Sequence, residues 1–353
     1  MFVTYAKQLL TSIKFPQIRL LSTCQSHKNT PLCLGLGSNV VDYIYSVESL
    51  PKEGMKGYFT RNVSIPHAKK AGGVVLNHLA WAAQLGVPCG LLALQGNDEE
   101  GRFLRQFLNS INVRTDFIDI SHQYNTGFSY IMVESSGERS IIMNLGSTAE
   151  MDESNVKRFI PSIQAEAGIV TCEISQVPLN GVLCVLDAAR SSGCLTILDV
   201  DVSPSVAINE AKLGTKQEIL EAISLADVVK PAGHVVNELL NLYSHNTISP
   251  NHNLSISLSH QLRNYTQCSL LAITNGSQPC ILSTREFDVE VDTVRVERIV
   301  DTTGAGDAFL AGLIKWIYDN GLPSTENELI SIGRLANQVA SKCVQTVGGV
   351  PDI

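Results

Sequence analysis

Short apolar runs alternate with helical patterns along most of this 353-residue chain, and this alternation limits the folds open to it. A short apolar run bounded by glycine, proline or polar residues is typical of a buried strand. Alternation of such strands with helices predicts an α/β fold whose mainly parallel sheet is covered on both faces. The strands expected are 32–36, 90–94, 167–171, 195–200, 228–230 and 270–274. The helices expected run from residue 71 to Gly86, from Asn97 or Asp98 through Leu108, and over 179–191, 216–225 and 255–265.

Two stretches have strand character but do not fit the alternation. We interpret them as a small β-sheet lid inserted at about 43–66 and 126–144 into one main domain, 32–353. The expected lid strands are 43–47, 58–64, 127–134 and 139–143, the last two joined as a hairpin by 135–138.

Composition excludes several classes of protein. Apolar residues make up 44% of the chain and charged residues 17%, which suits a globular protein with a large core. The net charge is −8 and no basic run is interleaved with aromatic residues, so nucleic acid is not an expected partner. The nine cysteines form no C-x-x-C pair, which favours a reducing compartment. No apolar stretch reaches 18 residues, so no membrane span is expected.

The N-terminal segment 1–31 differs from the rest of the chain. It holds four basic residues and no acidic one, and a helix there would separate apolar from basic side chains. These features predict a mitochondrial targeting peptide and a protein of the mitochondrial matrix. A basic tail on a cytoplasmic protein is the alternative.

A glycine-rich turn at 300–306 leads directly into an apolar helix. Its backbone N–H groups would point at one place, where the helix start adds a partial positive charge. Such a site attracts phosphate, and Asp307 would stand beside it. A carboxylate next to a bound phosphate suits removal of a proton from an attacking hydroxyl. The segment therefore predicts phosphoryl transfer.

Three sequence blocks in order resemble the ribokinase-like carbohydrate kinases, the phosphofructokinase-B family. They are 37–42, then 71–77 continued by 85–86 and 96–101, and finally 301–307. The resemblance covers nearly all of 32–350. It implies a three-layer α/β/α sandwich with a mainly parallel central sheet and a β lid. The implied reaction is transfer of the γ-phosphoryl group of ATP, with Mg²⁺, to a hydroxyl of a sugar or nucleoside.

The resemblance assigns the catalytic roles. Asp307 matches the general base, and the amides of Gly304, Ala305 and Gly306 match the cradle for the transferred phosphate. The helix start should lower the pKa of Asp307 and make it a weak base. A loose transition state, in which the hydroxyl proton is needed only late, tolerates a weak base.

Five further positions match acceptor contacts. Asp42 would bind sugar hydroxyls, assisted by Asn77 and by the backbone of Gly72 and Gly73. Glu173 follows a strand and is either a substrate or metal-network residue or a surface residue. For Asp42 the alternative is a solvated turn residue. For Asn77 it is a core amide bonded to the backbone.

The nucleotide and cation sites rest on the resemblance as well. The turn of Thr274, Asn275, Gly276 and Ser277 resembles the nucleotide-phosphate loop; the alternative is an ordinary Asn-Gly turn. Relatives hold a monovalent cation, typically K⁺, at the positions of Asp301 and Thr303, with carbonyls near 344–348. For Asp301 a strand-end cap is the alternative.

One departure from the family pattern concerns Mg²⁺. Many members carry Asn-x-x-Glu after a strand, where this chain has Ala232 and Val235. Glu238 could substitute if the loop is longer; otherwise the nucleotide phosphates and water would hold the metal. The departure motivates a rival hypothesis, a non-catalytic binding or scaffold protein on the same fold.

The lid bears on the acceptor and on assembly. Tyr43, Phe59, Phe128 and Tyr130 would stack on a base or close over a bare sugar. Lid strands in this family can pair between subunits, so a homodimer through the lid is a further hypothesis.

Overall fold

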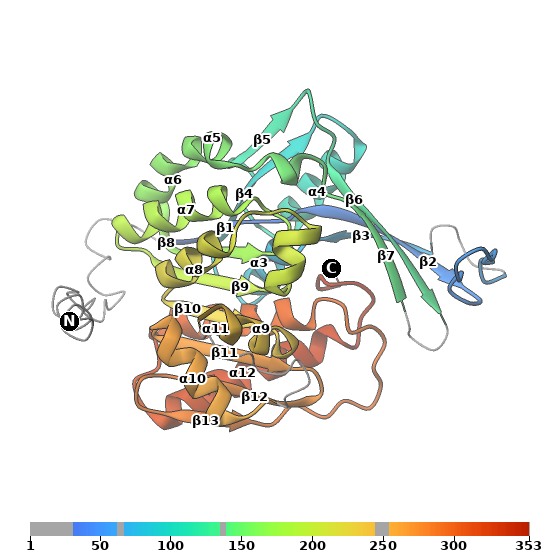
Figure 1. The fold of residues 1–353 in the computed structure, drawn as a ribbon. Coiled ribbons are helices and arrows are strands. Elements are labelled where there is room, and N and C mark those ends of the chain that lie inside the picture. The colour runs from blue at the N-terminus through green and yellow to red at the C-terminus, as the bar shows by residue number, and fades with distance from the viewer. Residues whose placement is uncertain (1–30, 62–66, 135–138, 244–253, 353) are drawn as a thin grey trace, which may run out of the picture.

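The computed structural model describes residues 31–61, 67–134, 139–243 and 254–352 (Figure 1). The predicted targeting segment, apart from residue 31, and the 135–138 turn lie outside the described residues. The main-sheet strands are β1 (Leu32–Leu36), β4 (Cys89–Gly96), β5 (Ile118–Ser121), β8 (Ala167–Ile174), β9 (Leu195–Val200), β10 (Val228–Pro231), β11 (Leu270–Asn275), β12 (Gln278–Ser283) and β13 (Asp288–Val291). They form one sheet in the order β13-β12-β11-β10-β9-β8-β1-β4-β5.

The sheet is parallel from β5 to β11, as the alternation predicts. At the other edge β12 and β13 pair antiparallel, and the sequence patterns missed both strands. Strand order reverses at β1, which has β4 on one side and β8 on the other. Ligands of open α/β sheets bind at the carboxyl ends of strands near such a reversal.

Helices cover both faces and complete the three predicted layers (Figure 1). The helices are α3 (Val74–Gln84), α4 (Glu99–Ser110), α5 (Glu153–Val156), α6 (Ile160–Glu166), α7 (Leu179–Ser191), α8 (Lys216–Leu225), α9 (Val236–Tyr243), α10 (Ile256–Thr266), α11 (Ala305–Asn320) and α12 (Glu326–Cys343). One core cluster joins the sheet to α6–α10, and the other joins it to α3, α4, α11 and α12.

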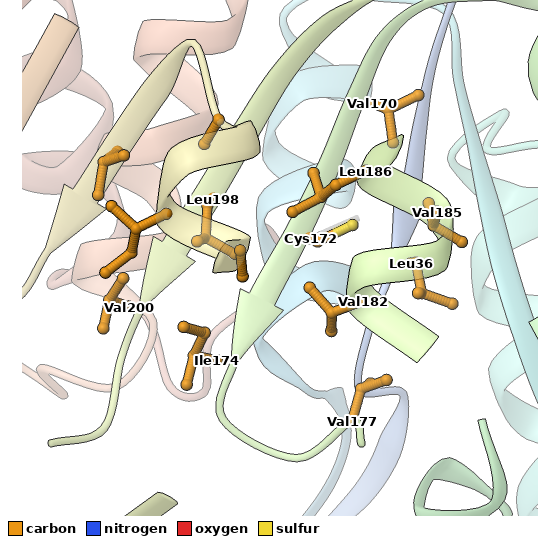
Figure 2. Close-up of a cluster of buried hydrophobic side chains, with 14 of the residues drawn as sticks. Leu36, Val170, Cys172, Ile174, Val177, Val182, Val185, Leu186, Leu198 and Val200 are labelled. Atoms are coloured by element: carbon orange, nitrogen blue, oxygen red, sulfur yellow. The ribbon is translucent and has the colours of Figure 1, made fainter. Parts of the chain in front are cut away.

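Alternation of side chains along each strand supplies both clusters. Val170 and Cys172 of β8 pack with Leu186 of α7 in the first cluster (Figure 2), whereas Ile169 belongs to the second. Each fully buried Val or Leu side chain contributes about 1.5–3 kcal/mol. Both faces of the sheet are therefore fixed, and so are the loops at its carboxyl edge.

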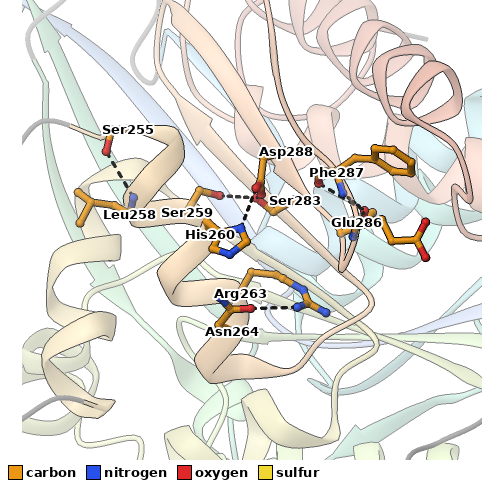
Figure 3. Close-up of polar contacts among 11 residues, drawn as sticks. Ser255, Leu258, Ser259, His260, Arg263, Asn264, Ser283, Glu286, Phe287 and Asp288 are labelled. Carbon is orange, nitrogen blue, oxygen red and sulfur yellow. Dashed lines mark hydrogen bonds and ion pairs between the residues drawn. The ribbon is translucent and has the colours of Figure 1, made fainter.

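Local polar signals fix where helices begin. Asp98 caps α4, accepting a 2.8 Å hydrogen bond from the N–H of Gly101, as the sequence suggested. At the antiparallel edge, α10 is tied to β12 and β13 by polar contacts (Figure 3). The hydroxyls of Ser259 and Ser283 lie 2.9 Å apart, and His260 Nδ1 lies 2.7 Å from Asp288. These contacts join α10 to the antiparallel edge of the sheet.

A second sheet projects from the main domain (Figure 1). This lid consists of β2 (Val40–Val47), β3 (Ala68–Gly72), β6 (Gly127–Glu134) and β7 (Arg139–Asn144), in the order β3-β2-β6-β7. In its described part, the strand predicted at 58–64 forms only an isolated antiparallel bridge, between Phe59 and Val47 of β2. The strand that pairs along β2 is 68–72, which the sequence patterns missed. Ala-Lys-Lys-Ala-Gly has little intrinsic strand preference, and pairing with β2 decides its conformation.

Candidate active site

The glycine-rich turn has the left-handed geometry that a phosphate loop requires at one position. Gly304 precedes α11 with φ 75°, and a Cβ there would lie 2.4 Å from the Gly349 Cα. Gly306 is already helical; its missing Cβ leaves room for the ammonium of Lys230, 3.3 Å from where that carbon would be. The N–H of Ala305 is partly engaged, at 3.3 Å from the Thr302 carbonyl. The first-turn amides of α11 face the place predicted for a phosphate.

Asp307 lies in the first turn of α11 and is 6% exposed. Its Oδ2 accepts a 2.7 Å hydrogen bond from Asn77 Nδ2 of α3. Burial raises the pKa of Asp307 well above the ordinary value, and the charges of Asp201 and Asp199 raise it further. The predicted lowering by the helix start is therefore wrong in direction, because desolvation outweighs the dipole. A raised pKa makes the carboxylate a stronger base.

A buried ion pair lies beneath the loop, and the sequence analysis missed it. Lys230 Nζ donates to both carboxylate oxygens of Asp199, at 2.7 and 2.9 Å. Burial alone would lower the pKa of Lys230, but the carboxylates of Asp199, Asp307 and Asp201 outweigh it and raise that pKa. The sequence does contain a signal for this pair: Asp199 and Lys230 are charged residues within the otherwise mostly apolar strands β9 and β10, near the carboxyl end of each. The register pairs Lys230 directly with Asp199.

Asp42 belongs to β2 and is 7% exposed, so the solvated-turn alternative is excluded. Burial raises its pKa to about 6, against the hydrogen bond from Ser129 that lowers it; the charge of Asp301 raises it further. A Cβ at Gly72 would collide with Asp42 Oδ2 at 2.1 Å. Gly73, with φ 109°, turns the chain from β3 into α3. The two glycines therefore let the Asp42 carboxylate lie against the start of the helix that carries Asn77.

Asn77 is a buried amide, and its side chain donates to a carboxylate and not to the backbone. Its Nδ2 serves Asp307, while its buried Oδ1 finds no donor among the described residues. A hydroxyl of a bound acceptor would satisfy that oxygen.

Glu173 lies in the interior, fully buried at the end of β8, so the surface alternative was wrong. Its carboxylate accepts hydrogen bonds from the N–H and hydroxyl of Ser38 and from the N–H of Val75. Burial raises the pKa of Glu173 to about 8, although the bonds from Ser38 lower it. Through these contacts Glu173 joins the turn after β1 to the start of α3. A substrate or metal-network role for its carboxylate stays a prediction.

The predicted nucleotide turn lies at the other end of the carboxyl edge. Thr274 and Asn275 end β11, and Gly276, with φ 59°, and Ser277 form the tight turn into β12. Thr274 pairs with Ala232 in an isolated bridge. The turn thus lies beside the segment that lacks the family's Asn-x-x-Glu.

Glu238 does not replace the missing glutamate. Its carboxylate accepts hydrogen bonds from the N–H and the hydroxyl of Ser205, at 3.0 and 3.1 Å. Val235, at the matching position, is fully buried. Among the described residues no three His, Cys, Asp or Glu side chains cluster as a metal site.

Asp301 and Thr303, the predicted cation ligands, are engaged within the protein. Asp301 Oδ1 accepts from the N–H of Thr303 and Oδ2 from the N–H of Gly348, both at 2.9 Å. The Thr303 hydroxyl accepts a 2.7 Å hydrogen bond from Arg139 of the lid.

The lid aromatics Tyr43, Phe128 and Tyr130 lie on the face of the lid opposite Asp42. Asp42 and Tyr43 are consecutive in β2, so their side chains point to opposite faces of the lid. The Tyr43 ring packs on Phe128 and Tyr130, and its hydroxyl donates to Glu100 of α4. The prediction that these rings stack on a base or close over a bare sugar stays a prediction.

Comparison with known proteins agrees with this geometry. Residues 38–353 match the family model described as pfkB family carbohydrate kinase. The chain is 24% identical over 342 residues to a probable chloroplastic fructokinase-6 of Arabidopsis thaliana, covering 94% of this chain and 82% of that one. It is 25% identical over 301 residues to a ribokinase of Dictyostelium discoideum, covering 81% and 87%.

Solved structures share the fold at lower identity. A ribokinase of Giardia lamblia superposes with a TM-score of 0.73 at 17% identity, covering 92% of this chain and 97% of that one. An Arabidopsis thaliana ribokinase, solved with ribose and ATP, gives 0.70 at 23% identity, covering 92% and 96%. With the family model matched along nearly the whole described chain, this protein belongs to the pfkB family of carbohydrate kinases and has the ribokinase fold.

Proposed function

We propose that this carbohydrate kinase transfers the γ-phosphoryl group of ATP to a hydroxyl of a small sugar or nucleoside, with Asp307 as the general base. The observation that carries the proposal is the buried Asp307 carboxylate in the first turn of α11, directly after the Gly304 turn. ATP use is supported by kinases of the same fold that have been solved with ATP bound.

The acceptor is held by Asp42 of strand β2 in the lid and by Asn77 of helix α3. Asp42 accepts hydrogen bonds from neighbouring hydroxyls, and Asn77 Oδ1 accepts another. Because Asn77 occupies Asp307 Oδ2, Oδ1 takes the acceptor's proton. The acceptor oxygen bonds to the γ-phosphorus as the bond to the β–γ bridging oxygen breaks. ADP leaves with that electron pair.

The protein supplies positive charge around the transferred group. The α11 amides and the Lys230 ammonium beside Gly306 stabilise the charge on the phosphoryl oxygens. Thr274, Asn275, Gly276 and Ser277 lie where the other phosphates would extend along the carboxyl edge. Mg²⁺, bound mainly by nucleotide phosphates and water, would neutralise further charge.

The test is coupled ADP release on a panel of sugars and nucleosides, with Asp307→Asn as the matched variant. We expect the isosteric variant to fold normally and to lose about 10²–10⁴-fold in kcat. Equal turnover in both proteins, or no turnover with any acceptor, would sink the kinase mechanism and favour the non-catalytic alternative.

Two finer features remain part of the proposal. A homodimer through the lid is supported by its exposed apolar side chains, such as Ile142 at 60% exposure and Tyr130 at 41%. Light scattering on the purified chain, compared with Ile142→Glu, tests it.

A mitochondrial matrix location is supported by the basic, acid-free segment 1–31. Sequencing the mature N-terminus from purified mitochondria tests it; an intact Met1 would contradict cleavage.

A further inference from the structure

Arg139 begins strand β7 of the lid, yet it contacts the segment that leads into the phosphate loop. Its Nη1 donates a 2.7 Å hydrogen bond to the Thr303 hydroxyl and lies 3.6 Å from Asp301 Oδ1. These partners are 164 and 162 residues away in sequence, so only the tertiary fold brings them together. Thr303 is followed directly by Gly304, the left-handed residue of the loop.

The strand register shows that Arg139 extends from the face of the lid that carries Asp42. Asp42 pairs with Ser129 and Ser129 with Met143, so these side chains share one face. Arg139 lies four residues from Met143 in β7, so its side chain is on the same face of the strand. One face of the lid therefore holds the acceptor carboxylate near its root and a guanidinium toward its tip.

The segment that Arg139 contacts is anchored at its other side. Asp301 accepts N–H bonds from Thr303 and from Gly348, which ties the segment to the C-terminal loop. Thr303 also receives a bond through its carbonyl from the Cys343 thiol. The hydrogen bond from Arg139 is thus the contact that comes from the lid.

The pair is poorly suited to a purely structural role. The side chains of Arg139 and Asp301 are 38% and 23% exposed, and ion pairs so open to water contribute little to stability. A guanidinium has five N–H donors, of which the bond to Thr303 uses one. Such a contact costs little free energy to break.

The contacts of Asp301 and Thr303 do not favour a monovalent cation bound by these two side chains. Both Asp301 oxygens already accept N–H bonds, and the Thr303 hydroxyl accepts from a positively charged group. A cation placed on these oxygens would meet the Arg139 guanidinium as a like charge. The lid therefore already supplies one positive charge beside these oxygens.

We propose that Arg139 is a positioning residue that couples the lid to the phosphate loop: its guanidinium holds Asp301 and Thr303 and supplies there the charge that the sequence assigned to K⁺. The inference rests on the proposed phosphoryl transfer. With the lid over the acceptor, Arg139 fixes the segment before Gly304, and so fixes the amides that hold the phosphate. Without it the loop is assembled less often, and water competes with the acceptor for the phosphoryl group.

The experiment compares the full-length wild type with Arg139→Ala and Arg139→Lys. The matched control is Arg61→Ala, which removes an exposed arginine from the connection between β2 and β3. ADP release and phosphorylated acceptor are measured together, with K⁺ or tetramethylammonium as the only monovalent cation. Thermal unfolding of the nucleotide-free proteins is followed in the same two salts.

We expect Arg139→Ala to lose about tenfold to a hundredfold in kcat, with more ADP released per acceptor phosphorylated and an unchanged Tm. Millimolar guanidinium should restore part of the loss, Arg139→Lys should be intermediate, and Arg61→Ala should match wild type. Wild type should show the same kcat and Tm in both salts.

Two results would overturn the inference while leaving the proposed function intact. One is wild-type kcat and coupling in Arg139→Ala. The other is a wild type that turns over only in K⁺ or is specifically stabilised by it. A wild type that phosphorylates no acceptor would instead refute the proposed function, and this inference with it.

Discussion

Asn77 Nδ2 of α3 donates a 2.7 Å hydrogen bond to Asp307 Oδ2 of α11, which joins two predicted site residues 230 positions apart. The bond stabilises the ionised carboxylate and therefore lowers the pKa of Asp307, against the larger effect of burial that raises it. It also leaves Oδ1 as the oxygen that does not accept from Asn77, and this is the oxygen that the proposed mechanism uses as the base. The two residues act as one unit, and this makes their coupling measurable.

Asn77→Ala should move the acidic limb of the kcat/KM profile to higher pH. Loss of the hydrogen bond, about 0.5–1.5 kcal/mol, raises the Asp307 pKa further, by up to about one pH unit. At neutral pH we expect kcat/KM to fall at least about tenfold, from misplacement and from protonation of the base. An acidic limb at its wild-type position would show that the amide does not act on Asp307.

Asp42→Asn should stabilise the protein while weakening acceptor binding. The folded-state pKa of Asp42 rises from 3.8 to about 6, so the folded state holds this proton more tightly than the unfolded state. Stability from this group is thus greatest at low pH and falls as pH rises from about 4 to about 6. The cost reaches about 3 kcal/mol above that window.

The asparagine removes that cost and still accepts from Ser129. Its Tm advantage over wild type should appear at pH 7–8 and vanish near pH 4 (roughly the unfolded pKa). An advantage of the same size at both pH values would contradict the buried charge as its cause.

Lys230→Met should destabilise the fold by about 3–5 kcal/mol, because it leaves the Asp199 carboxylate buried without its partner. The double variant Lys230→Met, Asp199→Leu should regain most of that stability, since no unpaired charge remains. Urea unfolding of both single variants and the double variant measures the coupling. Lys230→Met and the double variant should both be inactive, because both lack the positive charge beside Gly306. An active double variant would show that Lys230 has no part in the mechanism.

Glu173→Gln should lower stability by about 1–3 kcal/mol near pH 4.5, because its NH₂ group would face the N–H of Ser38 or of Val75. The loss should shrink as the pH rises towards 8, because burial raises the pKa of Glu173 to about 8 and the variant has no carboxylate to ionise. The measurement is Tm together with the acceptor KM. An unchanged Tm with a raised KM would support the ligand role that the sequence suggested for Glu173.

The three family blocks and the alternation of strands with helices were enough for the fold class and for most main-sheet strands. They were not enough for β3, because Lys69 and Lys70 carry no strand signal and pairing with β2 alone orders them. The strands β12 and β13 were missed for a similar reason: both are short, and they are ordered by antiparallel pairing of β12 with β11 and of β13 with β12.

The site divides in the same way. The sequence by itself determined the turn at Gly304 and the place of Asp307 at a helix start, because local chain geometry depends on neighbouring residues. Only the tertiary structure decided the direction of the Asp307 pKa, since burial and the charges of Asp199 and Asp201 come from distant strands. It likewise decided the inward position of Glu173 and the reach of Arg139 to Thr303. Desolvation and long-range contact depend on how the layers pack, and no local pattern records that.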